Sequence, residues 1–107
     1  MDPKSAQELG DEVRILDVRE PFEWDAGHIG GAIHIPLGEI PDRMEELSRS
    51  DRLVVTCAAG ARSTAASAFL KEKGFEVDNL DGGLVAWEQA GLPVVTDDGS
   101  PGTVALH

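Results

Sequence analysis

The single cysteine of this chain, Cys57, follows an apolar run at residues 53–56 and precedes a helix-forming stretch at residues 63–73. A thiol in a loop between a strand and a helix meets backbone N–H groups and the positive end of the helix dipole. This setting favours the thiolate, lowers the pKa of a cysteine and forms a cradle for an anion. We therefore predict that Cys57 is a nucleophile.

A charge of −11 makes the one loop cation, Arg62, conspicuous. Nine basic residues stand against 20 acidic ones. This balance argues against binding to nucleic acid or to an anionic membrane surface. It leaves Arg62 as the residue that we expect to attract an anionic ligand toward Cys57.

Chain length, cysteine count, apolar runs and histidine spacing further restrict the class of protein. The 107 residues fit one domain, and a lone cysteine forms no internal disulfide. The first residues have no apolar core of the signal-peptide kind, and no apolar run approaches the roughly 20 residues of a membrane span. His28, His34 and His107 lack metal-ligand spacing with Cys57. We expect a cytoplasmic monomer that uses no metal.

The elements that must position Cys57 are short strands alternating with helices. We predict strands at residues 13–18, 32–35, 53–56 and 75–80, and helices at 5–9, 21–26, 41–47, 63–73 and 84–90. This order predicts an α/β fold with a mainly parallel sheet, in which ligands bind beyond the C-terminal ends of the strands. Residues 1–95 would form the domain and residues 96–107 a flexible C-terminal tail.

Four motifs, in order, carry a resemblance to a known family: residues 16–24 (LDVREPFEW), 27–36 (GHIGGAIHIP), 57–63 (CAAGARS) and 80–87 (LDGGLVAW). Over about residues 4–95 the chain resembles a single-domain rhodanese-like sulfurtransferase. The resemblance implies a five-stranded parallel sheet flanked by helices. It also implies that no metal or organic cofactor is needed.

The resemblance further implies a reaction at Cys57. The cysteine would take a sulfane sulfur from a donor such as thiosulfate, become a persulfide, and pass the sulfur to cyanide or a thiol. The donor would be a small molecule or a protein persulfide. Backbone amides would hold the outer sulfur and the last side chain of the loop would favour an anionic donor, so the substrate-binding residues would be Ala58, Ala59, Gly60, Ala61 and Arg62. We interpret Asp17 and Arg19 as an ion pair that supports this loop.

One feature of the loop keeps other functions open. Several thiosulfate-using members have a basic residue directly after the cysteine, where this chain has Ala58. The alternatives are a sulfur-relay or partner-binding module without small-molecule turnover, and a phosphatase-like enzyme. The phosphatase reading is weakened because four residues separate Cys57 from Arg62, one fewer than that pattern requires.

Overall fold

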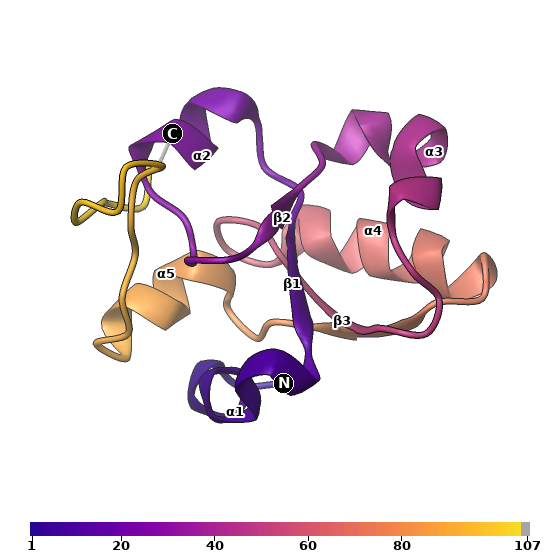
Figure 1. Cartoon of the computed structure of the whole chain (residues 1–107), viewed down its shortest axis with the longest axis horizontal. Helices are drawn as coiled ribbons and strands as arrows, with labels where there is room; N and C mark the ends of the chain where they lie inside the picture. The colour runs from indigo at the N-terminus through magenta and orange to yellow at the C-terminus, as the bar shows by residue number, and fades with distance from the viewer. Residues whose placement is uncertain (106–107) are drawn as a thin grey trace.

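The computed structural model describes residues 1–105, and His107 lies outside them. Its sheet has four parallel strands in the order β2-β1-β3-β4. In chain order the elements are α1 (Pro3–Leu9), η1 (Gly10–Glu12), β1 (Arg14–Asp17), α2 (Pro21–Ala26), β2 (Ile33–His34), η2 (Leu37–Glu39), α3 (Ile40–Arg43), η3 (Met44–Glu46), β3 (Arg52–Thr56), α4 (Ala61–Glu72), β4 (Glu76–Asn79) and α5 (Gly83–Gln89) (Figure 1). The predicted α/β class with a parallel sheet is confirmed.

Strand β3 lies inside the sheet and is buried on both faces, as its apolar sequence predicts. Successive side chains of a strand point to opposite faces. Leu53 and Val55 accordingly pack in the cluster that contains residues of α3 and α4, and Val54 packs in the cluster that contains residues of α1 and α5. Two helical layers therefore enclose the strand that ends at Cys57.

Within residues 1–105 the sheet has no fifth strand, so the predicted number of strands is wrong. Beside the end of β4, the ammonium of Met1 donates to the carbonyl oxygen of Asn79 at 2.9 Å, and Met1 accepts from the N–H of Asp81 at 2.8 Å. One residue with two such bonds does not extend into a strand. Residues 41–47 also depart from a single helix, because they divide between α3 and η3.

Residues 96–105, predicted to belong to a flexible tail, follow a hydrogen-bonded return to the body of the domain. Val95 exchanges two backbone hydrogen bonds of 2.8 Å with His28, and Thr103 donates its N–H to Ala26 at 2.9 Å. The mobility of this segment stays a prediction. Among residues 1–105, no helix has the length and apolar character to cross a membrane.

Parallel strands bring three connections to one edge of the sheet. β1 leads into α2, β3 leads through the Cys57 loop into α4, and β4 leads into α5. Figure 1 shows this loop between the start of α4 and the start of α5. The residues that follow these strands can therefore act on one small volume.

Candidate active site

The Cys57 sulfur is enclosed by the loop that it begins. Its Sγ accepts the N–H of Gly60 at 3.1 Å and the N–H of Ser63 at 3.4 Å, and lies 3.5 Å from the Ser63 hydroxyl oxygen. The residue is only 1% exposed. Because α4 begins at Ala61, two residues before the predicted start, the Ser63 amide belongs to the first turn and has no partner within the helix. The helix start thus supplies a donor to the sulfur.

These donors oppose the effect of burial on the thiol. Burial raises the pKa of Cys57, whereas hydrogen bonds from the Ser63 hydroxyl and from the amides of Ser63, Gly60 and Ala59 lower it. The donors prevail, and the pKa of Cys57 lies below its ordinary value. The site therefore favours a thiolate, the nucleophilic form of cysteine.

The first turn of α5 supports the loop from behind. The N–H groups of Leu84 and Val85 donate to the carbonyl oxygens of Cys57 and Ala58, each at 2.9 Å. Gly83 has φ +62°, and a Cβ built on it would lie 2.6 Å from each of these two oxygens. Only glycine allows α5 to approach so closely. The Ala58 carbonyl belongs to the same peptide group as the N–H of Ala59, one of the amides that lower the pKa of Cys57, so α5 fixes the orientation of that amide.

The cation of the loop is neutralised by an acidic residue of α2. The Arg62 guanidinium donates to the two carboxylate oxygens of Glu23 at 2.6 and 2.9 Å. The Glu23 side chain is fully buried, and that of Arg62 is 31% exposed. Hydrogen bonding to Glu23 raises the pKa of Arg62. The Glu23 carboxylate also accepts the N–H of Glu20 at 3.1 Å, so the start of α2 holds it in place.

Asp17 and Arg19 form the predicted ion pair at the end of β1. The Arg19 guanidinium donates to Asp17 Oδ2 at 2.8 Å and to the carbonyl oxygen of Gly27 at 2.7 Å, and both side chains are buried. Asp17 pairs in register with Thr56, the residue before Cys57. The pair therefore links the loops next to the cysteine, although the described contacts of Cys57 Sγ do not include it.

The residues that were predicted to bind the transferred sulfur have different roles in the structure. Gly60 contacts the sulfur with its amide, Ala58 turns its carbonyl to α5, and Ala59 and Ala61 are exposed. Ser63 and Glu23 were not predicted to be site residues. Ser63 had a usable signal, because it directly follows Arg62 in the same motif. Glu23 also lies in a quoted motif, at residues 16–24, but 39 positions separate it from Arg62, so no local pattern indicated their contact.

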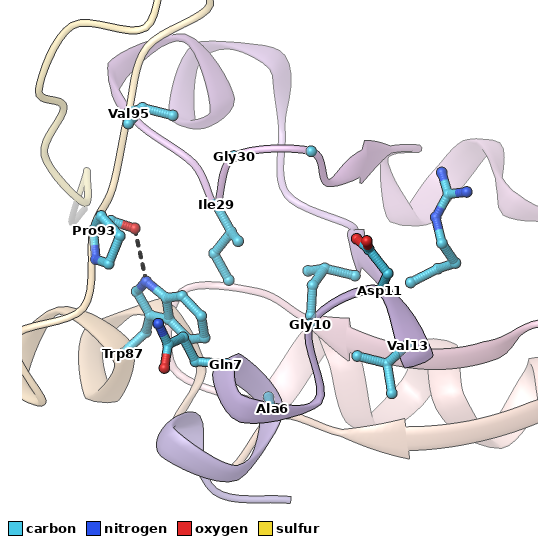
Figure 2. A pocket seen from close by; sticks show the side chains of 13 residues that line it. Ala6, Gln7, Gly10, Asp11, Val13, Ile29, Gly30, Trp87, Pro93 and Val95 are labelled. Atoms are coloured by element: carbon cyan, nitrogen blue, oxygen red, sulfur yellow. Dashed lines mark hydrogen bonds between the residues drawn. The ribbon is translucent and has the colours of Figure 1, made fainter.

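A cleft lies at another place on the molecule. It has a volume of about 560 Å³ and is bordered by residues at the start of β1, including Val13 and Ile15, and by Ile29 and Trp87. In Figure 2 the side chains of Ile29 and Trp87 point toward the same space, and the Trp87 indole donates to the carbonyl oxygen of Pro93. Neither Cys57 nor its loop lines this cleft.

Comparisons with known proteins agree with the geometry. The Rhodanese-like domain family matches residues 2–90. A sulfurtransferase of Allochromatium vinosum is 40% identical over 97 residues, covering 88% of this chain and 91% of that protein. The crystal structure of a rhodanese-related protein from Thermoplasma volcanium superimposes with a TM-score of 0.88 at 36% identity, covering 91% of this chain and 97% of that one. An NAD-dependent persulfide reductase from A. fulgidus is 42% identical with a TM-score of 0.64, over 71% of this chain and 14% of that chain.

Proposed function

Because this chain belongs to the rhodanese-like sulfurtransferase family, we propose that it transfers a sulfane sulfur through a persulfide on Cys57. The observation that carries the proposal is the buried Sγ with amide donors from Gly60 and Ser63. A thiolate with a lowered pKa attacks without a general base. The residues that flank it, from Ala58 to Arg62, form the binding loop for the transferred sulfur.

The proposed reaction has two displacements. In the first, Cys57 Sγ bonds to the outer sulfur of the donor, the S–S bond of the donor breaks, and the remainder leaves with the bonding electrons. In the second, the thiolate of an acceptor, or cyanide, attacks the outer sulfur of the persulfide, and the Cys57 thiolate leaves. The same amides stabilise the thiolate before the first step and after the second. Protein persulfides and small molecules can serve as donors by this chemistry.

Loop geometry supports sulfur transfer over phosphate hydrolysis. Two amides already converge on a single sulfur atom, and Arg62 is engaged by Glu23 rather than directed at a bound anion. A phosphate bound to this loop would need wider spacing of the amides and an unpaired guanidinium.

Replacing the sulfur nucleophile tests the proposal. Cys57→Ser should abolish transfer of sulfur from either thiosulfate or a thiol persulfide to cyanide, measured as thiocyanate, because a serine hydroxyl forms no persulfide. Circular dichroism of the variant should match the wild type. Residual transfer by the folded variant would contradict the mechanism. Hydrolysis of an aryl phosphate by the wild type, with no thiocyanate formed, would replace it with the phosphatase reading.

A further inference from the structure

The charges around the sulfur site nearly cancel before any donor arrives. The Asp17 and Arg19 side chains neutralise each other, and Glu23 neutralises Arg62 with two hydrogen bonds of 2.6 and 2.9 Å. Cys57 therefore adds an unbalanced negative charge to the site whenever its thiol is ionised. The loop side chains between Cys57 and Arg62 are methyl groups or hydrogen. No unneutralised cation of the loop is therefore directed at an incoming anion.

Several other cations lie at the far ends of the elements that carry the site. Arg52 begins β3, which ends directly before Cys57, and Lys71 lies in the last turn of α4, which begins beside it (Figure 1). Five strand residues span roughly 16 Å and twelve helical residues roughly 18 Å. Both distances exceed the Debye length of about 8 Å at physiological ionic strength. Arg43, on α3, is already paired with Glu39 and Glu46.

From this arrangement we infer that Glu23 determines the donor class, so that the site prefers persulfides of thiols to thiosulfate. The inference rests on the proposed sulfur transfer. Thiosulfate carries two negative charges, whereas a thiol persulfide R–S–SH carries at most one on its terminal sulfur. Approach of the dianion toward a thiolate requires a compensating cation, and the Glu23 carboxylate removes the compensation that Arg62 would supply.

The preferred first step is balanced without a further reactant. Cys57 Sγ forms a bond to the terminal sulfur of R–S–SH, the S–S bond of the donor breaks, and RS⁻ leaves with the bonding electrons. The product is Cys57–S–SH, and the net charge of −1 is unchanged. With thiosulfate the departing group would be sulfite, and three negative charges would meet in the site.

The test compares thiosulfate with the persulfide of 2-mercaptoethanol as donors, with cyanide as the acceptor. Glu23→Gln keeps the shape of the side chain and an acceptor for the Glu20 amide, but releases the charge of Arg62. The ratio of kcat/KM for thiosulfate to kcat/KM for the persulfide should rise about tenfold. Glu23→Gln combined with Arg62→Gln should return the ratio toward the wild-type value, because both charges are then absent.

Asp25→Asn is the matched control. It removes one negative charge from the same helix, at an exposed residue whose side chain has no described contact with Glu23 or Arg62. The ratio for this variant should stay within about twofold of the wild type, since an exposed charge is largely screened. A folded Glu23→Gln protein with an unchanged ratio, or an equal rise in Asp25→Asn, would overturn the inference.

The wild-type protein gives a second test that does not depend on folding of a variant. Raising the ionic strength from about 10 mM to about 0.15 M shortens the Debye length from about 30 Å to about 8 Å. The kcat/KM for thiosulfate should increase, because screening weakens repulsion by an acidic site and an acidic protein. A decrease would reveal attraction by an unneutralised cation and would contradict the inference. Failure of Cys57 to take sulfur from either donor would instead remove the proposed function and this inference together.

Discussion

The sites at the two ends of the parallel sheet differ in volume and in the chemical groups that line them. At the C-terminal ends of the strands, Cys57 is buried in a small loop and its sulfur accepts two amide hydrogen bonds. Near the N-terminal end of β1 lies the cleft of about 560 Å³, lined largely by apolar side chains such as those of Ile29 and Trp87 (Figure 2). The cleft near β1 does not include the nucleophile, whereas the Cys57 loop encloses a single sulfur atom.

The difference follows from the direction of the helices. Helix α4 places its N-terminal amides at the cysteine, and α5 places its N-terminal amides on the carbonyls behind it. The partial positive charge of a helix start favours the thiolate at this end of the sheet. The other end receives the C-terminal turn of α4, where the partial charge is negative. Directed donors, rather than the volume of a cavity, therefore identify the reactive end.

Among substitutions that keep the cysteine, one that displaces the Cys57 loop should reduce sulfur transfer the most. In Gly83→Ala the new Cβ must displace the carbonyls of Cys57 and Ala58, so kcat/KM for sulfur transfer should fall about a hundredfold, as expected for a nucleophile displaced by about 1 Å. The pH midpoint of Cys57 alkylation should rise, because the amides no longer converge on the sulfur. Both are measured on protein that is shown to be folded by its thermal unfolding transition.

Gly82→Ala is the matched control for the Gly83 substitution. Gly82 also has a positive φ, +72°, and its new Cβ would also lie 2.6 Å from another atom, but that atom is the Cβ of Ala86 in α5. The backbone strain in the two variants is comparable, at about 1–2 kcal/mol. If both variants lose the same activity, α5 stabilises the fold without positioning the loop.

Removing the side-chain donor should have a smaller effect. In Ser63→Ala the hydroxyl 3.5 Å from Cys57 Sγ is lost while the amide donor remains. That hydroxyl stabilises the charged form, so its loss should raise the pKa of Cys57. Activity near neutral pH should fall about threefold and recover at higher pH, where the thiolate is again populated. The rate of alkylation as a function of pH measures the shift.

Ser67→Ala provides the comparison on the same helix. The Ser67 hydroxyl is buried and has no hydrogen-bond partner within residues 1–105. Its loss should leave the alkylation midpoint where it is. An equal shift in both serine variants would show that the Ser63 hydroxyl acts on α4 rather than on the sulfur.

A substitution in the distal cleft should have the smallest effect. Gln7 lines that cleft from α1 and has no described contact with the Cys57 loop. Gln7→Ala should change kcat/KM for sulfur transfer by less than about twofold, as is usual for a substitution far from the reacting atoms. A larger loss, measured in the same thiocyanate assay, would mean that the two ends of the sheet are coupled.

Local sequence signals were sufficient to predict the reactive end of the sheet. The apolar residues before Cys57 predicted the strand that ends at the cysteine, and Gly60 was predicted to belong to the loop that binds the sulfur, where it adopts φ +113°. Long-range contacts were not predictable in this way. Glu23 reads locally as part of the first turn of α2, and only the fold, which brings its side chain to the first turn of α4, makes it the partner of Arg62. Likewise, Gly83 reads as a turn residue until its distance to the Cys57 carbonyl is known.

The most direct test of the central claim is the mass of the protein after exposure to the persulfide of 2-mercaptoethanol, combined with peptide mapping. Since Cys57 is the only cysteine, a persulfide must appear there. We expect the wild type to gain one sulfur atom on Cys57 and to lose it when a thiol acceptor is added, with the sulfur recovered on the acceptor. An unmodified Cys57 that iodoacetamide still alkylates readily would contradict the claim, because the thiolate would then be present and accessible without accepting sulfur.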